Sequence, residues 1–136
     1  MDVRRSLAFV VALLIAVPLA AQQTPAQKAA EDAEFLKGAY IAGAEGVTYP
    51  VVLKELKPRY TAEAMREKLQ GQVEIQAIVG VDGKVERARV IKSLDTVLGL
   101  DEAALAAAKA WVFKPGTKDG QPVPVVVNLM LDFRLH

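Results

Sequence analysis

The sequence of residues 123–135, VPVVVNLMLDFRL, decides the fold of this chain. Every odd-numbered position in it carries an apolar side chain, whereas the even-numbered positions include polar residues such as Asn128. An alternation with a period of two is typical of a strand with one buried face. Pro122 and Pro124 cannot donate backbone hydrogen bonds, so we expect the start of this strand to lie at a sheet edge. A long edge strand is either a structural element only or a docking site for an extended peptide.

A hairpin is predicted upstream of this strand. Residues 72–81 alternate between polar and apolar side chains, and the Asp-Gly dipeptide at 82–83 is a strong signal for a two-residue turn. Residues 84–91 then return as a second strand. The parity of their apolar positions changes near 86–87, which predicts a bulge because one extra residue reverses the facing of everything after it.

Two helices complete the predicted domain. Thr61 can cap a short helix, and a second helix begins at Leu100, where Asp101 is either the N-cap or an anion of the first turn. Its apolar face ends in Trp111. The expected fold class is α+β, with a three-stranded antiparallel sheet, both helices packed on one face and the other face open.

The first 21 residues have the composition of an export signal. Arg4 and Arg5 precede an apolar run of eleven residues, 7–17, and small residues follow before a polar start at Gln22. We expect a cleaved signal peptide at residues 1–21, or, as the alternative, a short inner-membrane anchor. Residues 22–49 are then a flexible, partly helical tether, and residues 50–136 form the folded domain.

The composition argues against several function classes. Lys and Arg number 17 and Asp and Glu 16, so there is no basic excess to bind nucleic acid. The chain has no cysteine and a single histidine, His136. A nucleophile with its base, or a cluster of metal ligands, has almost no residues from which to form. We therefore expect a protein that is not an enzyme and that has no cofactor and no metal.

Several short motifs occur in an order and spacing that resemble a known family. In chain order they are Pro58-x-Tyr60-x-x-Glu63-Ala64, Gly71-x-Val73, Asp82-Gly83-x-Val85, Leu100-Asp101-x-Ala103-Ala104-Leu105 and Trp111-x-Phe113-x-Pro115, followed by the strand at 123–135. Together they resemble the C-terminal domain of TonB proteins over about residues 50–135.

This resemblance implies a periplasmic interaction domain. In the family, the anchored protein couples the proton motive force, through ExbB and ExbD, to uptake by outer-membrane receptors. A short receptor segment, the TonB box, adds as a strand beside the last strand of the domain, which is β-augmentation. The residues to which the resemblance points as the contact surface are Lys57, Pro58, Arg59, Tyr60, Val123, Val125, Val126, Val127, Asn128 and Leu129.

Three functions are compatible with these features. The first is an inner-membrane-anchored energy transducer that pulls on receptors. The second is a secreted periplasmic adaptor without a link to the proton-driven motor, because the apolar segment is short and the tether lacks a Pro-rich spacer. The third is a homodimer formed by pairing of two edge strands. If the edge is free, replacing Val125 or Val127 by proline should abolish docking more than folding.

Overall fold

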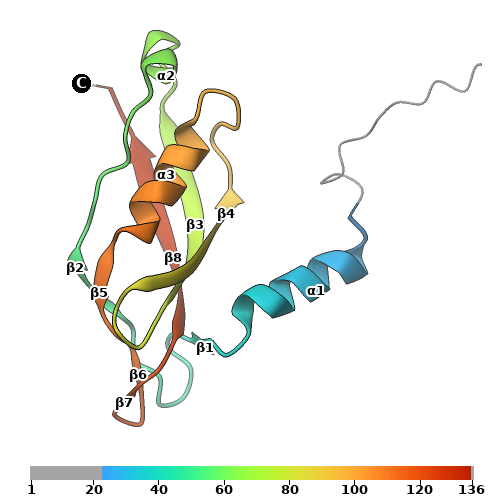
Figure 1. Cartoon of the computed structure of the whole chain (residues 1–136), viewed down its shortest axis with the longest axis vertical. Coiled ribbons are helices and arrows are strands. Elements are labelled where there is room, and N and C mark those ends of the chain that lie inside the picture. Colours follow the sequence, from blue (N-terminus) through green and yellow to red (C-terminus); the bar gives the residue numbers. More distant parts are fainter. Residues whose placement is uncertain (1–22, 136) are drawn as a thin grey trace, which may run out of the picture.

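The computed structural model describes residues 23–135, so the predicted signal peptide or anchor at 1–21 lies outside the described residues. The elements in chain order are α1 (Pro25–Leu36), β1 (Tyr40–Ile41), β2 (Val51–Lys54), α2 (Ala62–Arg66), β3 (Gly71–Val79), β4 (Val85–Lys92), α3 (Leu100–Lys109), β5 (Val112–Lys114), β6 (Thr117–Lys118), β7 (Gln121–Pro122) and β8 (Val125–Phe133). Figure 1 shows an α+β body from which α1 projects as an arm. None of the described helices has the length and apolar character needed to span a bilayer.

The long C-terminal strand forms as its alternation predicts. β8 covers nine residues, and its buried positions have odd numbers. It pairs antiparallel with β3 along its whole length, from Phe133 opposite Gly71 to Val125 opposite Val79. The strand is shorter than residues 123–135, because Pro122 belongs to the separate strand β7 and Pro124 lies between the two.

The predicted hairpin joins β3 to β4, but its turn is not the predicted two-residue turn. The amide of Gly83 donates to the Gly80 carbonyl oxygen at 2.9 Å and the amide of Gly80 donates to the Lys84 carbonyl oxygen at 2.8 Å, so residues 81–83 form a three-residue loop with Gly83 at positive φ. Ile78 pairs with Arg87 and Val79 with Val85, which leaves Glu86 as the extra residue and confirms the predicted bulge. A second register shift leaves Ile91 unpaired between Val90 and Lys92, and the sequence pattern did not indicate it.

The predicted sheet is wrong in its number of strands. The antiparallel strands β8, β3 and β4 are present, but the sheet has the order β1-β8-β3-β4, and β1 is parallel to β8. Two small sheets, β2 with β5 and β6 with β7, accompany it. β1 was missed because two residues carry no measurable alternation.

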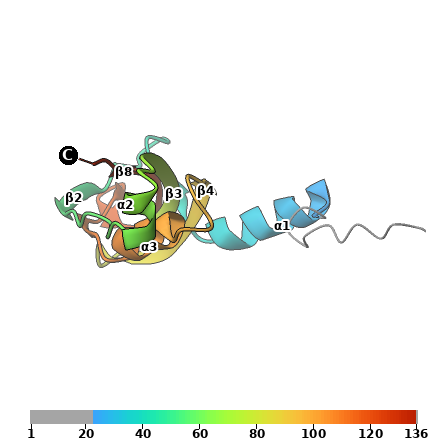
Figure 2. The ribbon, with the colours of Figure 1, turned by 90° about the horizontal axis from the view of Figure 1, so that it is seen from above.

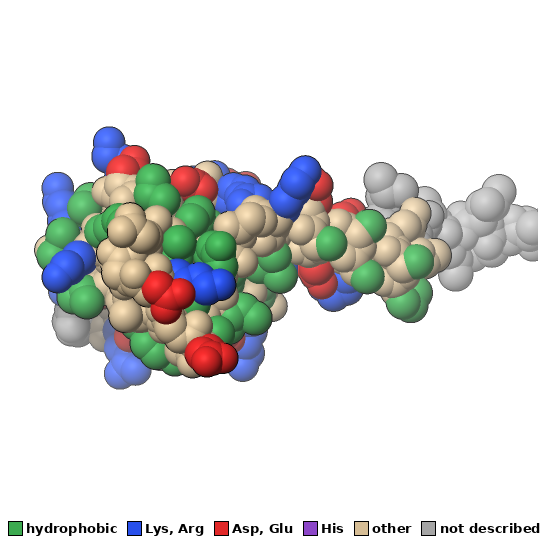
Figure 3. All heavy atoms as spheres, turned by 90° about the horizontal axis from the view of Figure 1, so that it is seen from below, with side chains coloured by type: hydrophobic (Ala, Val, Ile, Leu, Met, Phe, Trp, Pro, Cys, Tyr) green, Lys and Arg blue, Asp and Glu red, His purple; other side chains and the backbone are tan. Residues whose placement is uncertain are grey.

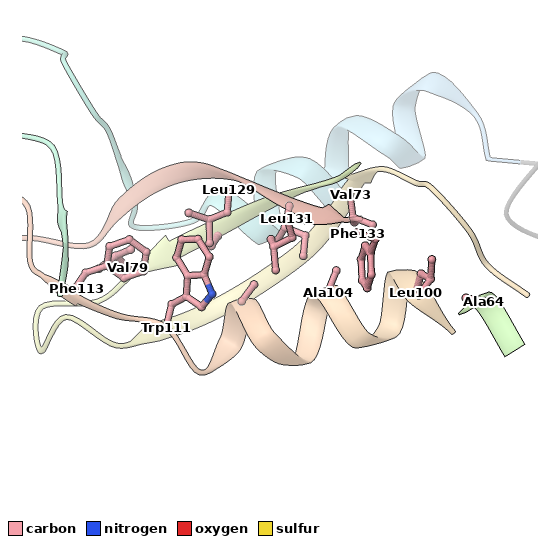
Figure 4. Packing of buried hydrophobic residues seen from close by; sticks show 13 residues of the cluster. Ala64, Val73, Val79, Leu100, Ala104, Trp111, Phe113, Leu129, Leu131 and Phe133 are labelled. Atoms are coloured by element: carbon pink, nitrogen blue, oxygen red, sulfur yellow. The ribbon is translucent and has the colours of Figure 1, made fainter. Parts of the chain in front are cut away.

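The main core lies between the sheet and α3. Figure 4 shows Leu129, Leu131 and Phe133 directed from β8 toward this helix, whose Ala104 allows a close approach, and Trp111, which follows the helix, directed toward the sheet. The short helix α2 contributes only Ala64 to the core and lies at the end of the sheet beside the start of α3 (Figure 2). Only α3 therefore covers this face along the strands, in contrast to the predicted pair of helices.

The caps differ between the two domain helices. Thr61 is the N-cap of α2, as predicted, and its Oγ1 accepts from the amide of Ala64 at 3.3 Å. Gly99 is the N-cap of α3, and Asp101 lies in the first turn, which confirms the second of its two predicted roles. The buried Asp101 carboxylate accepts hydrogen bonds from the hydroxyl of Ser93 and from the amide of Leu94 at 2.9 Å. Asp101 thus holds the loop before the helix against the first turn.

The face of the sheet opposite α3, called here the second face, is not open as predicted. Ile78 lies on it, by its alternation with Ala77, and has no exposed surface. The last turn of α1 reaches the same face, where Arg89 on β4 forms a 2.7 Å ion pair with Asp32. Part of the tether therefore packs on the domain.

Candidate functional site

The outer edge of β8 is only partly occupied. β1 pairs with Val125 and Val126, and within residues 23–135 no strand pairs with the outer edge beyond Val126. The amide of Tyr40 donates to the carbonyl oxygen of Pro124 at 2.8 Å, so the backbone of this even-numbered residue faces outward. Successive residues of a strand direct their backbone groups to opposite sides.

This alternation identifies the free hydrogen-bonding groups of the edge. Asn128, Met130 and Asp132 each present an amide N–H and a carbonyl oxygen to the outside, whereas Val125 and Val127 direct theirs to β3. The edge is therefore a row of three donor–acceptor pairs. The expectation that proline at Val125 or Val127 would spare folding is not compatible with this geometry.

An apolar cavity of about 760 Å³ adjoins the first part of this edge. β8 and β3 form its floor. Residues 36–42, from the end of α1 through β1, form one wall, and residues 49–52, at the start of β2, form the other. The lining residues are Leu36, Ala39, Ile41, Ala42, Tyr49, Pro50, Val52, Gln76, Phe113, Val126, Val127, Asn128 and Leu129. The cavity is large enough to hold several apolar side chains of a strand that is added to β8.

A second, more polar cavity of about 330 Å³ follows toward the end of β8. It lies between the strand and the extended segment 55–60 and is lined by Glu55, Leu56, Lys57, Pro58, Tyr60, Trp111, Met130, Leu131, Asp132, Phe133 and Arg134. Tyr60 is fixed there, because its hydroxyl donates to the Leu69 carbonyl oxygen and its ring meets Phe133 edge-on at 5.4 Å. Tyr60 is thus half in the core and half in the cavity.

The structure separates the predicted contact residues into three groups. Those at the first cavity are Val126, Val127, Asn128 and Leu129, and those at the second are Lys57, Pro58 and Tyr60. The other three lie elsewhere. Arg59 is exposed and lines neither cavity, and the amide of Val123 donates to the Gly116 carbonyl oxygen. Val125 is buried and lies opposite Tyr40 of β1.

Sequence reasoning missed the wall that precedes the domain. Leu36 and Ile41 belong to the residues read as tether, and nothing in their sequence pattern pairs them with β8. The only usable signal was the weak helical stripe that includes Leu36 and Tyr40, which suggests a helix that packs on something.

Charges around the site are mixed. On the face that Figure 3 shows, acidic and basic side chains are distributed over the body without a region of one sign. The second cavity carries two acidic residues, Glu55 and Asp132, and two basic ones, Lys57 and Arg134. Within the described residues no group of three or more His, Cys, Asp or Glu side chains is placed to hold a metal ion.

Comparison with known proteins relates the chain to one family. The family model described as the Gram-negative bacterial TonB protein C-terminal matches residues 57–135, more than half of the chain. Protein TonB of Vibrio cholerae is 27% identical over an alignment of 103 residues that covers 70% of this chain and 42% of that protein. Protein TonB of Xanthomonas campestris is 34% identical over 79 residues, which are 58% of this chain and 35% of that protein.

A solved structure was also compared. The solution NMR structure of the Pseudomonas aeruginosa TonB C-terminal domain aligns with a TM-score of 0.46 at 16% identity, covering 71% of this chain and 96% of that one. The chain spans less than half the length of the curated relatives it matches. On the match to residues 57–135, the chain belongs to the family of Gram-negative bacterial TonB protein C-terminal domains.

Proposed function

We propose that this protein is a TonB-like periplasmic protein that binds a short extended segment of outer-membrane receptors by adding it as a strand to the outer edge of β8. The observation that carries the proposal is the row of backbone groups at Asn128, Met130 and Asp132 that no strand within residues 23–135 pairs with, and that runs from the apolar cavity to the second cavity. In such β-augmentation, main-chain hydrogen bonds supply affinity and pockets for alternate side chains supply selectivity. Affinity should therefore depend more on the edge than on the exact peptide sequence.

Family membership supports a role in energy-coupled transport across the outer membrane. In this proposal the domain faces the periplasm and acts without catalysis or a cofactor. Coupling to the proton motive force through ExbB and ExbD requires that residues 1–21 stay in the inner membrane as an anchor. Cleavage after Ala21 would instead give a secreted adaptor that keeps the peptide-binding edge.

The test is direct binding of receptor segments. Fluorescein-labelled peptides that carry the TonB boxes of the host's own outer-membrane receptors are titrated with the full chain, and fluorescence anisotropy is measured. We expect saturable binding, together with a change in the emission of Trp111, the only tryptophan, which lines the second cavity. Absence of binding by every peptide would overturn the proposal.

Two further measurements separate the alternative roles. Sedimentation velocity tests for a homodimer, which would occupy the same edge and make peptide binding weaken as protein concentration rises. Intact mass from membrane and periplasmic fractions distinguishes the anchored transducer from the secreted adaptor. A mass that begins at Gln22 in the soluble fraction supports the adaptor.

A further inference from the structure

Residues 32–42, called here the strap, cross the second face of the sheet from β4 to the outer edge of β8. At the β4 end, Arg87 donates to the carbonyl oxygens of Glu34 at 3.0 Å and Lys37 at 2.8 Å. These carbonyls lie at the C-terminal end of α1, where Lys37 is the C-cap, and a cation is favourable there because it faces the negative end of the helix dipole.

A second arginine holds the same end of the strap. Arg89 forms the 2.7 Å ion pair with Asp32, and its guanidinium lies 4.2 Å from the centre of the Phe35 ring. The same side chain donates to Gln76 Oε1 at 2.7 and 3.0 Å, which fixes its orientation on the second face. The strap is therefore fixed at this end by three independent kinds of contact: an ion pair, hydrogen bonds to carbonyls and cation–π packing.

The other end of the strap is β1. Tyr40 and Ile41 pair in parallel with Val125 and Val126, so the first part of the β8 edge is closed to any other strand. Ile41 keeps 72% of its surface exposed, and it lines the apolar cavity together with Leu36. An unusually exposed isoleucine beside unpaired backbone has apolar area left to bury.

We propose that the strap is a part of the peptide site. An added strand begins at Val127, directly after β1, and places an apolar side chain against Leu36 and Ile41. The inference rests on the proposed strand addition and names the chemistry of the partner. The peptide is apolar at its end next to β1, and polar at its other end, where Lys57 and Asp132 line the second cavity.

The strap lies before residues 57–135, which the family model matches. Selectivity of this chain would therefore depend on residues outside the matched domain. Opposite Val127–Phe133 there is room for about seven residues, since strands pair residue by residue. Both directions of the added strand can use the free backbone groups, so the position of the apolar end identifies the direction.

Two variants of the full chain test whether the strap forms a wall of the peptide site. The probe is the TonB-box peptide that binds the wild type most tightly. Leu36→Ser and Ile41→Ser should each weaken binding about three- to tenfold, because they remove apolar area from the cavity. The control is Ile91→Ser, since Ile91 is also an exposed isoleucine, at 44%, but lies on the bulge of β4 at the far side of the sheet. Equal effects of Ile41→Ser and Ile91→Ser would overturn the inference.

A reversible lock tests whether β1 stays in place. The chain has no cysteine, so Ile41→Cys with Val126→Cys introduces one defined pair at two positions that lie directly opposite each other in the strand register. We expect it to oxidise without the peptide, and the oxidised form to bind at least as tightly as the reduced form of the same protein. Failure to oxidise, or loss of binding only after oxidation, would overturn the inference because β1 would then have to leave the edge.

Strand addition at β8 and the role of the strap would be contradicted by different results. The proposal of strand addition is wrong if the wild type binds no peptide. It is also wrong if Met130→Pro, which removes the outward-facing amide of Met130, leaves binding unchanged. The role of the strap alone is contradicted if the wild type binds peptide and Met130→Pro removes binding, but Ile41→Ser and Ile91→Ser have equal effects. It is likewise contradicted if the cysteine pair does not oxidise or if oxidation abolishes binding.

Discussion

The indole Nε1 of Trp111 donates a 2.9 Å hydrogen bond to the carbonyl oxygen of Leu56. This bond joins the end of α3 to the extended segment that forms the outer wall of the second cavity. Trp111 is 6% exposed and Leu56 is half-buried, so the bond is largely shielded from water. This one contact, between residues 55 positions apart in the chain, therefore fixes both the position of the indole and the outer wall of the second cavity.

Trp111→Phe should therefore lower both stability and peptide affinity. The substitution keeps an aromatic ring but leaves the Leu56 carbonyl without its donor, which costs about 1–3 kcal/mol of unfolding free energy for a buried group. Urea unfolding followed by circular dichroism gives this value. An unchanged midpoint would show that water replaces the indole and that the wall is not fixed by this bond.

Proline substitutions distinguish the two sides of β8. Met130→Pro removes an amide that faces the free edge, so the midpoint of thermal unfolding should stay within a few degrees of that of Met130→Ala, while peptide binding is lost. Val127→Pro removes an amide from the ladder with β3 and should unfold the domain. Melting curves and anisotropy titrations measure the two effects. Binding by Met130→Pro equal to that of Met130→Ala would place the peptide elsewhere.

Gly83 and Gly120 allow the cost of close packing at a turn to be separated from the cost of a left-handed backbone conformation. Both have positive φ, +81° and +83°, but a Cβ at Gly83 would lie 1.8 Å from the Phe113 carbonyl oxygen, whereas nothing lies within 4 Å at Gly120. Gly120→Ala should cost about 1–2 kcal/mol, the penalty of the left-handed conformation alone. Gly83→Ala should cost on the order of 4 kcal/mol, since the backbone must shift as well.

Urea unfolding of both glycine variants measures the difference. The hairpin turn must come close to β5, because the amide of Phe113 donates to the Gly83 carbonyl oxygen at 2.8 Å. Equal destabilisation by the two substitutions would mean that this contact between the turn and β5 can relax without cost.

Local signals in the sequence were sufficient for much of the fold. The alternation in β8, the Asp-Gly turn and the cap at Thr61 each act within a few residues, so they can be read from the chain alone. The bulge at Glu86 could be located because it changes the parity of the apolar positions.

Long-range pairings could not be read in this way. β1 has two residues, and its partner Val125 is far along the chain, so no periodicity connects them. Arg87 and Arg89 have the pattern of solvated strand positions, and only the packed α1 shows them as contacts. The half of the candidate site on β8 was therefore predictable, whereas the wall formed by the strap was not.

Asp95 should make the stability of the α3 start depend on pH. Its carboxylate accepts from the amides of Leu98 at 3.0 Å, Val97 at 2.9 Å and Leu100 at 3.2 Å, and these bonds, that of Leu98 foremost, lower its pKa below the usual 3.8. Because the folded-state pKa is lowered, the stabilisation is present above the unfolded-state value and is lost as pH falls through the folded-state value.

Melting temperatures of wild type and Asp95→Asn at pH 7 and pH 3 test this dependence. The wild type should lose more stability than the variant between the two pH values, because asparagine cannot be protonated there. Glu102→Gln, at an exposed carboxylate of the same helix start, is the control and should keep the wild-type pH dependence. An identical decline in all three proteins would contradict the role of Asp95.

Asp32 should make the strap itself sensitive to acid. The hydrogen bond from Arg89 lowers the pKa of Asp32 below its usual 3.8, with a further contribution from Lys28, which lies 3.6 Å away. The lowered pKa means that the ion pair stabilises the docked strap above the unfolded-state pKa, and that this contribution disappears as pH falls through the folded-state pKa. The effect should be confined to the strap, because Asp32 lies on α1 and its ion pair with the domain is to the half-buried Arg89 of β4, outside the core.

Amide exchange of Tyr40 reports on this docking, because its N–H bonds to the Pro124 carbonyl oxygen only when β1 is in place. Corrected for the intrinsic pH dependence of exchange, its protection measured by NMR should decrease at low pH while the amide of Ile75 in the core ladder stays protected. In Asp32→Asn the protection of Tyr40 should be reduced at neutral pH and should no longer depend on pH in this range. Full protection of Tyr40 in that variant would show that the hydrogen bonds of Arg87 and the packing of arginine on Phe35 hold the strap, and that the Asp32 ion pair contributes nothing to the geometry of the site.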